Sequence, residues 1–410
     1  MDASAAAELP LTSPGAPDRA PGRAGPAFAL AGGLATIAAT LVLSRRFASV
    51  DLLRFPLCWI GVLAALDGLG RLRHGASALP TARSWLFAAA GSLAFWDLFE
   101  VLNLRLQNWW YVGVSAELLP SAAFAAVSFA TVLPAVRLGE AALRGRGTGP
   151  IARHTGLVLN ASGKPPSTEA ARPGALVPLL LGCLALALPL LAPRFAFPLA
   201  WLFLWPLAEG LLRALPPDPQ AAPSPLESLA AGDRTRLPRL MAIGLGLGLV
   251  WESLNWGCAR GWVYTVPFFS GGKLFEMPLP GYLGYLPFAL ECAAGLSLLD
   301  RLSRAWSRRA ALGAALLLLG AHVGLEATAF PRSTLSTTRE VTQARPGSLA
   351  QVARLGTANA ARLRAAGIAT PFDLAAVDPD ELSYRLAAQG HALPADVLRL
   401  WVGAARRELR

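Results

Sequence analysis

Two acidic side chains lie within apolar stretches of this chain, and each is followed three residues later by an asparagine. Glu100 and Asn103 form the first pair, and Glu252 and Asn255 form the second. Residues three apart share one face of a helix. Ionisable groups are costly inside an apolar span, so they are candidates for function. An apolar environment favours the neutral form of a carboxylic acid, which can then protonate a double bond or a leaving group.

Two other roles fit a carboxyl group with an amide neighbour. The pair could clamp a polar ligand, or it could form hydrogen bonds between helices that contribute about 1 kcal/mol per contact. Glu100 and Glu252 are therefore candidate catalytic acids, with structural hydrogen bonding as the alternative. The sequence leaves this choice open, because the pair occurs twice and aromatic residues flank it both times.

Aromatic residues accompany both pairs. Trp109 and Tyr111 follow the first pair, Trp251 immediately precedes the second acid, and Trp262 and Tyr264 follow the second pair. Tryptophan and tyrosine form belts where membrane helices reach the water interface, which is the simpler explanation for any one of them. The alternative is an aromatic lining for a π-rich or cationic intermediate. These five residues and the two asparagines are the candidate binding residues.

A broken segment at 265–279 separates the second aromatic group from the next apolar helix. It contains two prolines, the Gly271-Gly272 pair and three phenylalanines. It is too short and too interrupted to cross a bilayer, so we expect a re-entrant or interfacial loop. Lys273 and Glu276 are placed to pair across it.

Two further acids fall near the second pair. Glu276 lies in the broken segment, and Glu291 lies in the apolar helix that follows it. We expect both to support a catalytic site centred on Glu252 or Glu100.

No metal and no soluble cofactor are expected. His322 and Glu326 share one face of the last apolar stretch, but a lone His–Glu pair does not make a metal site. The sequence has no CxxC pair, P-loop, nucleophile elbow or dinucleotide fingerprint. The four cysteines are scattered through apolar stretches: Cys58, Cys183, Cys258 and Cys292.

The composition indicates the class of protein. Of the 410 residues, 54% are hydrophobic and 15% are charged, and the mean hydropathy is +0.45. Soluble domains carry about 25% charged residues, so we expect an integral membrane protein. The formal charge of +11 fits an excess of Lys and Arg in cytoplasmic loops better than it fits nucleic-acid binding.

Nine apolar segments are predicted to span the bilayer, each near the ~20 residues that a membrane helix needs. The expected fold is therefore an all-α, polytopic helical protein of the cell inner membrane. Residues 1–26, rich in Ala and Pro, are predicted to form a disordered tail. The nine segments are 27–44, 52–70, 84–104, 118–137, 175–192, 196–214, 239–257, 280–299 and 310–329.

Basic residues gather after the second, fourth and eighth segments. These loops lie on one side of the membrane if the count is right, which places the N-terminus in the cytoplasm. Nine spans then place the C-terminus outside. Arg45 and Arg46, after the first segment, disagree weakly. The three groups are Arg71, Arg73 and Arg83; Arg144, Arg146, Arg153, Lys164 and Arg172; and Arg301, Arg304, Arg308 and Arg309.

The sequence indicates an internal duplication. In residues 46–71, RFA is followed by FPLCW, seven residues and DGLGR; in residues 194–213, RFA is followed by FPLAW, seven residues and EGLLR. The next helices continue the order with FEVLN and WESLN, each followed by a Trp-x-Tyr sequence. Sites commonly form between parallel membrane repeats, so we expect Glu100 and Glu252 to face a shared interior at similar depth.

This duplication divides the chain into six parts. Between the N-terminal tail and the C-terminal domain lie two membrane repeats, a polar basic linker that joins them, and one additional span. The ranges are 1–26 for the tail, 27–137 for the first repeat, 138–173 for the linker, 174–300 for the second repeat, 301–330 for the additional span and 346–410 for the C-terminal domain.

The C-terminal domain resembles a helix-hairpin-helix unit. Such units use a hairpin with two glycines whose backbone amides approach a DNA phosphate; here Gly356 matches the second glycine and Arg354 stands at the first. Acidic residues in the same stretch oppose phosphate binding. We therefore expect a domain that binds a protein partner, and nucleic acid is not expected as a partner. The acidic residues are Asp373, Asp378, Asp380 and Glu381.

The region 249–292 resembles uncharacterised, internally duplicated bacterial membrane proteins with the pattern W-E-x-x-N…W-x-Y-T-V-P-F…F-E-M-P…P-F-A-L-E. More distantly, it is similar to the lycopene cyclase domain of carotenoid biosynthesis. Pro280-Gly281 stands where the cyclases have paired glutamates. The matching positions are Trp251-Glu252, Trp262-Val263-Tyr264, Gly271 and Pro278-Leu279.

This resemblance implies a membrane enzyme that acts on a lipid-soluble isoprenoid, with Glu252 or Glu100 as the proton donor. The alternative class is a non-catalytic membrane scaffold or small-solute carrier, whose polar helix faces hold helices together or line a ligand path. Access from the bilayer to Glu252 favours the enzyme, and a continuous polar path across the membrane favours the carrier.

Overall fold

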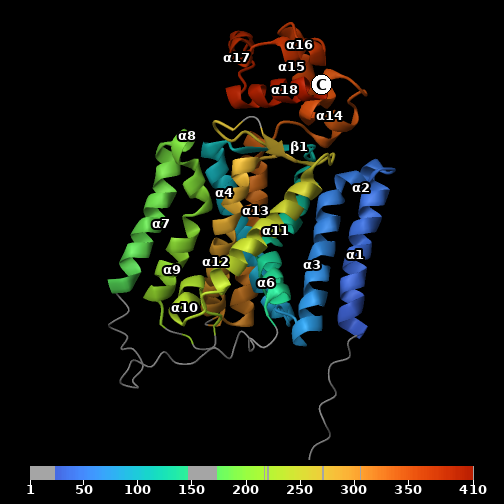
Figure 1. Cartoon of the computed structure of the whole chain (residues 1–410). Coiled ribbons are helices and arrows are strands. Elements are labelled where there is room, and N and C mark those ends of the chain that lie inside the picture. The colour runs from blue at the N-terminus through green and yellow to red at the C-terminus, as the bar shows by residue number, and fades with distance from the viewer. Residues whose placement is uncertain are drawn as a thin grey trace, which may run out of the picture.

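Long helices lie side by side through most of the molecule, and a group of short helices covers one end of them (Figure 1). This computed structural model describes residues 24–145, 173–216, 218, 221–269, 272–304 and 306–409. Within these ranges, eight helices are long and apolar enough to cross a membrane, and a bent pair of helices can make a ninth. The prediction of an all-α, polytopic membrane protein is confirmed.

The spans follow the predicted segments closely. In the first half they are α1 (Ala24–Ser44), α3 (Arg54–His74), α4 (Ala82–Leu106) and the pair α5 (Leu118–Phe129) and α6 (Val132–Leu143), with the short α2 (Ala48–Leu52) after α1. Next come α7 (Pro173–Leu191), the bent pair, α11 (Arg236–Asn255), α12 (Tyr285–Arg304) and α13 (Arg308–Thr328).

Four helices cross the expected domain boundaries, and one of them, α7, begins at the last residue of the predicted linker. α1 begins within the predicted tail, α6 ends within the predicted linker, and α12 ends within the range expected for the additional span. The rest of the tail, 1–23, and most of the linker, 146–172, lie outside the described residues.

The span expected at 196–214 is bent rather than straight. Two short helices and a longer one meet there at an angle of 50°. Proline lacks the backbone donor that would continue a helix, and Pro193, Pro198 and Pro206 are spread over this segment. The helices are α8 (Pro193–Ala196), the 3-10 helix η1 (Phe197–Trp201) and α9 (Leu204–Ala214), and α10 (Pro225–Ala230) follows.

Helices α1 and α3 pack closely because glycine removes a side chain at two contact points. A Cβ atom at Gly33 would lie 2.6 Å from the Ala65 nitrogen, and a Cβ atom at Gly68 would lie 2.5 Å from the Leu30 nitrogen. Small residues allow membrane helices to bring their backbones together in this way.

Helices α7 and α9 of the second half meet through the same arrangement. A Cβ atom at Gly182 would lie 2.7 Å from the Leu207 nitrogen, and a Cβ atom at Gly210 would lie 2.8 Å from the Leu179 nitrogen. In both halves the first helix contributes Leu-x-x-Gly, and the glycine of the second helix lies three residues after the contacted nitrogen.

A two-stranded antiparallel ribbon joins the halves at one end of the bundle. β1 (Trp109–Val112) follows α4, and β2 (Gly261–Tyr264) follows α11. Trp109 lies opposite Tyr264, and Tyr111 lies opposite Trp262. These strands were not predicted from the sequence.

The two faces of the ribbon have different neighbours, because successive residues of a strand point to opposite faces. Trp109, Trp262 and Tyr264 belong to the core of the helical bundle. Trp110 and Val263 belong to the core of the C-terminal helices. The ribbon therefore separates the two cores.

The broken segment after β2 forms a short hairpin of β3 (Lys273–Leu274) and β4 (Met277–Pro278), and η2 (Leu279–Gly284) leads from it into α12. The expected pairing of Lys273 with Glu276 is wrong. Glu276 Oε1 lies 3.1 Å from Arg354 Nη2 instead, and Lys273 Nζ donates to the Tyr264 carbonyl at 3.0 Å. Gly271 lies outside the described residues.

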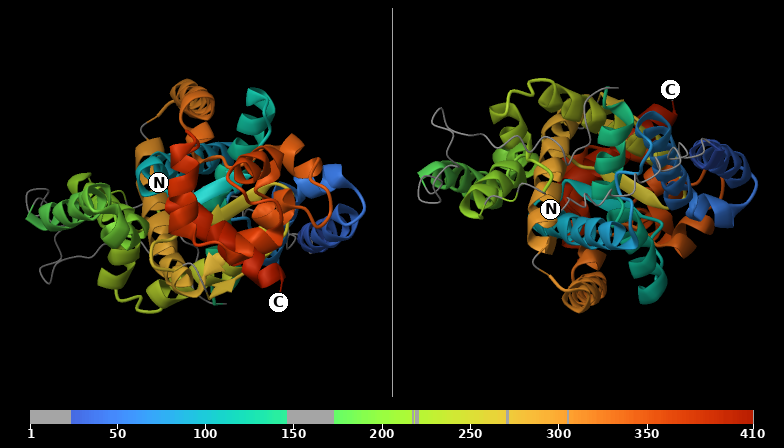
Figure 2. Two further views of the ribbon diagram at one scale, coloured as in Figure 1. Left: turned by 90° about the horizontal axis from the view of Figure 1, so that it is seen from above. Right: turned by 90° about the horizontal axis from the view of Figure 1, so that it is seen from below.

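The C-terminal helices form a unit with its own apolar core, which covers the ribbon when the bundle is viewed along its length (Figure 2). Leu363, Leu374 and Trp401 are fully buried in it. Its elements are α14 (Thr338–Thr342), η4 (Leu349–Arg354), α15 (Gly356–Ala365), α16 (Pro371–Ala376), α17 (Pro379–Ala388) and α18 (Ala395–Glu408). The 3-10 helix η3 (Phe330–Ser333), which packs on α13 and α4, leads into it.

The hairpin between η4 and α15 faces the membrane part of the molecule. Arg354 and Gly356 have φ angles of 57° and 84°. Arg354 Nη1 donates to the Cys258 carbonyl at 2.6 Å, and a Cβ atom at Gly356 would lie 2.9 Å from Ser336 Cβ. This hairpin is thus buried against the molecule itself.

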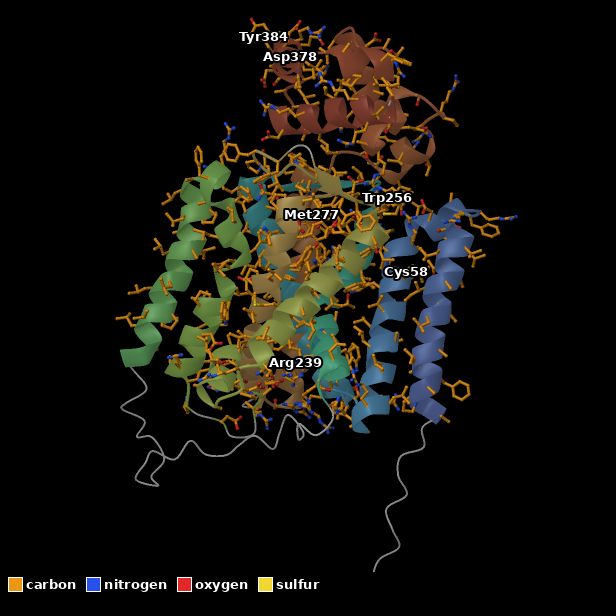
Figure 3. The ribbon with its side chains drawn as sticks, viewed as in Figure 1. Cys58, Arg239, Trp256, Met277, Asp378 and Tyr384 are labelled. Atoms are coloured by element: carbon orange, nitrogen blue, oxygen red, sulfur yellow. The ribbon has the colours of Figure 1, made fainter. Side chains whose placement is uncertain are left out.

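Labelled side chains mark the two ends of the molecule (Figure 3). Arg239 lies at the end where α1 begins, whereas Asp378 and Tyr384 lie at the far tip of the C-terminal unit (Figures 1 and 3). Between these ends, the outer helices expose large apolar side chains, with Leu34 of α1 and Leu181 of α7 each 55% exposed and Leu317 of α13 76% exposed. Such surfaces fit the hydrocarbon core of a bilayer.

Candidate functional site

Each predicted asparagine holds the turn that leads into one strand of the ribbon. Asn103 Oδ1 accepts from the Asn108 nitrogen at 2.9 Å, and its Nδ2 donates to the Trp109 carbonyl at 2.8 Å. Asn255 Oδ1 accepts from the Trp262 nitrogen, and its Nδ2 donates to the Trp262 carbonyl, both at 2.9 Å. Both asparagine side chains therefore bind backbone groups, and these hydrogen bonds hold Trp109 and Trp262, the first aromatic residue of each strand, in place.

Glu100 is fully buried and accepts three hydrogen bonds at one oxygen. Its Oε1 receives Trp96 Nε1 at 2.9 Å, Trp109 Nε1 at 3.1 Å and the Tyr111 hydroxyl at 2.5 Å. Its Oε2 has no hydrogen-bond partner among the described residues. All three donors come from the first half of the chain.

Glu252 is also fully buried, but its donors come from two different elements. Its Oε1 accepts from the Tyr264 hydroxyl of β2 and from the Tyr285 hydroxyl of α12, both at 2.7 Å. Trp262 Nε1 donates to the Tyr264 hydroxyl at 2.9 Å. Glu252 Oε2, like that of Glu100, has no partner in the described part of the chain.

Aromatic rings connect the two acids across the middle of the molecule. Trp96, one helical turn before Glu100, has its ring centroid 5.7 Å from that of Trp251, which precedes Glu252. The tryptophans beside the two acids therefore pack against each other, and the shared interior expected for the acids themselves stays a prediction.

A cavity of about 460 Å³ lies within this aromatic region. Ligand pockets have volumes of about 300–1,000 Å³ and are mostly apolar. None of the described residues that line this cavity carries a charged side chain. Five tryptophans from both halves contribute to its wall: Trp59, Trp96, Trp109, Trp201 and Trp251.

The cavity opens on the apolar surface of the bundle. Leu283 of η2 and Phe269 line it, and they are 67% and 38% exposed. Gly244 and Gly248 of α11 lie deeper in the wall. A molecule dissolved in the bilayer could thus enter the cavity without crossing a charged surface.

The two carboxyl groups do not line this cavity, but all of their hydrogen-bond donors except Tyr111 do. Tyr264 and Tyr285 place hydroxyl groups between Glu252 and the cavity. Burial, together with the Glu252 carboxyl group, raises the pKa of Tyr264 well above its usual value. The Tyr264 hydroxyl therefore keeps its proton at neutral pH and can pass it on only while it receives another.

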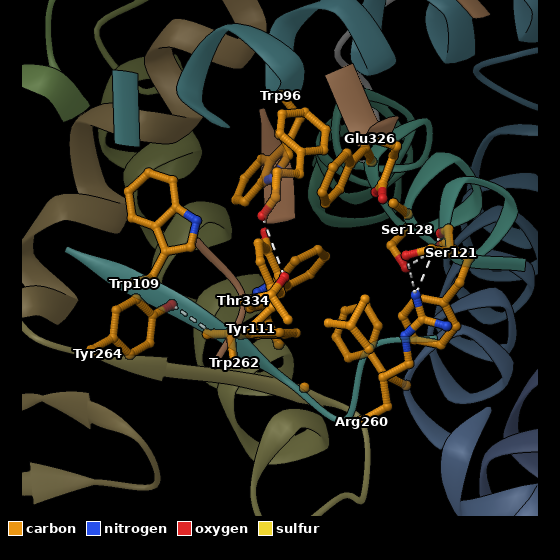
Figure 4. Close-up of a pocket in the computed structure, with 18 of the residues that line it drawn as sticks. Trp96, Trp109, Tyr111, Ser121, Ser128, Arg260, Trp262, Tyr264, Glu326 and Thr334 are labelled. Atoms are coloured by element: carbon orange, nitrogen blue, oxygen red, sulfur yellow. Dashed lines mark hydrogen bonds between the residues drawn. The ribbon is translucent and has the colours of Figure 1, made fainter. Parts of the chain in front are cut away.

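A smaller cavity of about 60 Å³ adjoins the first one, and Trp96, Trp109, Trp251 and Tyr264 are among the residues that line both (Figure 4). Tyr111 lines only the smaller cavity. Both donors to Glu252 are tyrosines that line the large cavity. Of the three donors to Glu100, only the two tryptophans line it.

The smaller cavity has a polar side formed by Arg260, Ser121 and Glu326 (Figure 4). The Arg260 guanidinium carbon lies 3.7 Å from the centre of the Phe124 ring, and Nη2 lies 3.4 Å from the Ser121 carbonyl. Burial lowers the pKa of Arg260 to about 10, so it remains a cation at neutral pH. This cluster was not predicted from the sequence.

Neither Glu276 nor Glu291 shares a hydrogen-bond partner with Glu252. Glu276 pairs with Arg354 of the C-terminal unit. Glu291 Oε1 accepts from the backbone nitrogen of Leu204, the first residue of α9, at 2.8 Å. A carboxylate at this position caps a helix N-terminus, so Glu291 stabilises the bend in the second half.

His322 is fully buried and contacts polar groups of α4 and α5. Its Nδ1 lies 2.9 Å from Asp97 Oδ1, and its Nε2 lies 3.1 Å from the Ala122 carbonyl. Among the described residues there is no group of three or more His, Cys, Asp or Glu side chains that could hold a metal ion.

Some site residues were missed. Trp96 lies four residues before Glu100, and that helical spacing was a signal available in the sequence. Tyr285, in contrast, reaches Glu252 from 33 residues further along the chain, and no local pattern indicates this contact. Comparison of the chain with protein-family models, with curated proteins and with solved structures gave no match.

Proposed function

We propose that this protein binds a lipid-soluble isoprenoid chain in the aromatic cavity and acts on it by protonation, with Glu252 as the acid. One observation carries the proposal: a fully buried carboxyl group is joined by two tyrosine hydroxyls to the wall of a large apolar cavity that opens on the membrane surface. Tyr264 and Tyr285 are the groups that contact the chain.

The reaction needs no oxidant and no cofactor. Glu252 gives its proton to Tyr264 while Tyr264 gives its hydroxyl proton to one carbon of a double bond. The new C–H bond uses the π pair, and the adjacent carbon becomes a cation. A second double bond of the same chain can attack that cation and close a ring. Loss of a proton from a neighbouring carbon, back through Tyr264 to Glu252, restores both the double bond and the acid.

The cavity wall suits such an intermediate. Cations are attracted to the faces of tryptophan and tyrosine rings by about 0.5–2 kcal/mol each. Five tryptophans line the cavity, and no carboxylate among the described lining residues could capture the cation. At the position where lycopene cyclases have paired glutamates, Pro280 and Gly281 form part of the wall. The proposed acid is therefore Glu252, and the likeness to the cyclases remains part of the proposal.

The proposed duplication is supported by two sets of matched contacts. The glycine contacts between α1 and α3 have the same spacing as those between α7 and α9. The Asn103 and Asn255 side chains make the same backbone hydrogen bonds before β1 and β2. If the halves are repeats, the cavity lies where parallel repeats commonly place a site.

The proposed location is the cell inner membrane, with the N-terminus in the cytoplasm. The Arg73 side chain at the end of α3 and the buried Arg236–Glu140 pair lie at the end of the bundle away from the C-terminal unit. The described basic residues of the predicted loops, among them Arg83, Arg144 and Arg301, belong to that end, which favours a cytoplasmic position for it. The C-terminal unit would then lie outside.

We propose that the C-terminal unit binds a protein partner rather than nucleic acid. Its hairpin is turned toward the ribbon, and Arg354 is occupied by Glu276 and the Cys258 carbonyl. On its surface, Phe372 and Tyr384 are 68% and 78% exposed. Exposed aromatic residues are enriched where proteins bind each other.

A non-catalytic scaffold is the second candidate function. It is favoured by one observation: Glu100 and Glu252 each bind donors from the ribbon, so both could serve only to hold the ribbon on the bundle. A small-solute carrier is less well supported, because the described residues around the large cavity provide no charged path.

Two experiments separate these functions. The protein would be co-expressed with enzymes that produce a linear carotenoid, and the pigments would be analysed by chromatography. A cyclised product that disappears in Glu252→Gln supports the enzyme, and unchanged pigments would rule out a carotenoid as the substrate. Quenching of tryptophan fluorescence by the alcohol geranylgeraniol, in purified protein, then tests whether the cavity takes any isoprenoid chain. Absence of quenching would exclude isoprenoid binding and favour the non-catalytic scaffold.

A further inference from the structure

A second pocket lies directly above the aromatic cavity, where the membrane part meets the C-terminal unit. It has a volume of about 230 Å³, several times the ~30 Å³ that a water molecule occupies in the liquid. Three parts of the chain form it: Arg194 from α8, described residues from the end of β2 to the start of β3, and the first turns of α18.

This pocket is cationic. Arg194, Lys273 and Arg399 line it, and Asp396 is the one acid among its described lining residues. Arg399 is already paired, because its guanidinium lies 2.8 Å from Asp396 Oδ1 and 2.6 Å from Asp380 Oδ1. The excess positive charge is therefore carried by Arg194 and Lys273.

Neither Arg194 nor Lys273 forms an ion pair with a carboxylate of the described residues. Lys273 Nζ uses one of its three donors on the Tyr264 carbonyl. Burial lowers the pKa of Lys273 to about 8. The charged form of this ammonium group is therefore less stable in the folded protein than in water. The Arg194 guanidinium lies 5.7 Å from the centre of the Phe268 ring. An anion in the pocket would supply the partner that both cations lack.

The cationic pocket and the aromatic cavity share a wall. Tyr264 and Val266 line both of them. Thr265, between these two residues, lines the cationic pocket, and its backbone nitrogen donates to the carbonyl of Asn108, which lines the cavity. Residues 264–266 therefore lie between the two pockets, which are neighbours in the structure.

We propose that the pocket formed by Arg194 and Lys273 binds the phosphate group of an isoprenoid phosphate whose chain occupies the aromatic cavity. This rests on the proposed function, since it takes the same cavity as the site of the chain. Phosphate fits because Arg and Lys both form strong, charge-assisted hydrogen bonds to its oxygens. The proposal narrows the substrate class from isoprenoids in general to those that carry an anionic end.

The test compares three probes on the full-length protein in detergent micelles: geranylgeranyl monophosphate, geranylgeraniol and inorganic phosphate. Quenching of tryptophan fluorescence reports binding of the two isoprenoids, and the melting temperature reports binding of all three. We expect the monophosphate to bind at least about tenfold more tightly than the alcohol, since charged hydrogen bonds contribute about 1.5–3 kcal/mol each. Inorganic phosphate alone should change the melting temperature little.

Two variants locate the effect. Lys273→Met and Arg194→Gln should each weaken monophosphate binding about tenfold and leave the alcohol unchanged. Arg46→Gln is the matched control, because Arg46 is an exposed arginine at the same end of the bundle, outside the pocket. Arg194 lies in a short surface helix, so its variant should fold even if the lysine variant does not.

Each other outcome overturns the inference in a recognisable way. Equal binding of the monophosphate and the alcohol would remove the phosphate site but leave the proposed function intact. Absence of binding by both would remove the proposed function as well. A melting-temperature increase with inorganic phosphate that matches the increase with the monophosphate would make the pocket a site for free anions and not for lipids.

Discussion

The clusters around Glu100 and Glu252 share residue types but differ in what they contact. Glu100 accepts its three hydrogen bonds from Trp96, Trp109 and Tyr111, all in the first half. Glu252 accepts from two tyrosines, and both of these line the large cavity. Similar motifs thus place Glu100 among donors of its own half, whereas they place Glu252 beside two tyrosines that both line the large cavity. The difference teaches that a shared motif fixes the turn in each half, while one residue from a later span, Tyr285, adds a second link between Glu252 and the cavity wall.

The largest expected effect comes from removing each acid in turn. General acid catalysis contributes about 10²–10⁴-fold to a rate, so Glu252→Gln should lower product formation at least about a hundredfold. Glu100→Gln should change it by less than about threefold, because that acid has no hydroxyl at the cavity wall. Product analysis in the co-expression assay measures both, with melting temperatures as the control for folding. Equal losses in the two variants would remove the distinction between the halves.

Substitution of the contact glycines tests whether the halves are equivalent in packing. Gly68→Ala and Gly210→Ala place a methyl group 2.5 Å and 2.8 Å from a backbone nitrogen. Each should lower the free energy of unfolding by about 1–3 kcal/mol. Gly320→Ala in α13 is the control, since no atom lies within 4 Å of its added carbon. Thermal unfolding in detergent measures the three changes, and a large loss at only one of the contact glycines would contradict equivalence.

Removal of single hydroxyl groups separates the tyrosines of the two strands. Tyr264→Phe breaks the connection between Glu252 and the cavity, so it should reduce product formation about tenfold, as expected for one hydrogen bond to a charged or reacting group. Tyr111→Phe removes the corresponding bond to Glu100 and should affect the melting temperature more than the rate. The reverse pattern would place the working acid in the first half.

The smallest expected effect is a pH dependence of stability that Lys273 causes. Lys273 follows β2, so this effect arises in the second half only. Burial lowers its pKa from 10.5 to about 8. Between these values the unfolded chain binds the proton and the folded chain does not, so stability rises with pH from about 8 to about 10.5. Below pH 8 both states are protonated and the slope disappears. The difference in melting temperature between the native protein and Lys273→Met should follow this window, and a flat difference would show that the lysine is not buried in solution.

The sequence predicted the elements that depend on local pattern. Apolar segments of about 20 residues located the spans, and the repeated FPLxW and ExLN-type motifs pointed to both acids and both asparagines. The three-residue spacing of Glu252 and Asn255 correctly placed them on one helix, since both lie in α11.

Features that depend on contacts between distant segments were not predictable. β1 and β2 are only four residues long and pair across about 150 residues of chain, so neither shows the alternation of a longer strand. The Tyr285–Glu252 contact arises from how α12 packs on α11. The pairing of Glu276 with Arg354 required knowledge that the C-terminal unit returns to the ribbon. The sequence placed Lys273 and Glu276 close together, but the hairpin points them to different partners.

Successive residues of the ribbon point alternately toward the aromatic cavity and toward the C-terminal unit, and this links the two regions. Trp109 and Tyr264 contribute to the cavity wall, while their immediate neighbours Trp110 and Val263 are fixed in the core of the C-terminal unit. A shift of either face therefore moves the other, because neighbouring side chains share one backbone. Filling of the cavity and binding of a partner to the C-terminal unit would then influence each other's affinity equally in both directions. The ribbon would therefore couple the proposed lipid site in the membrane to the proposed partner surface of the C-terminal unit.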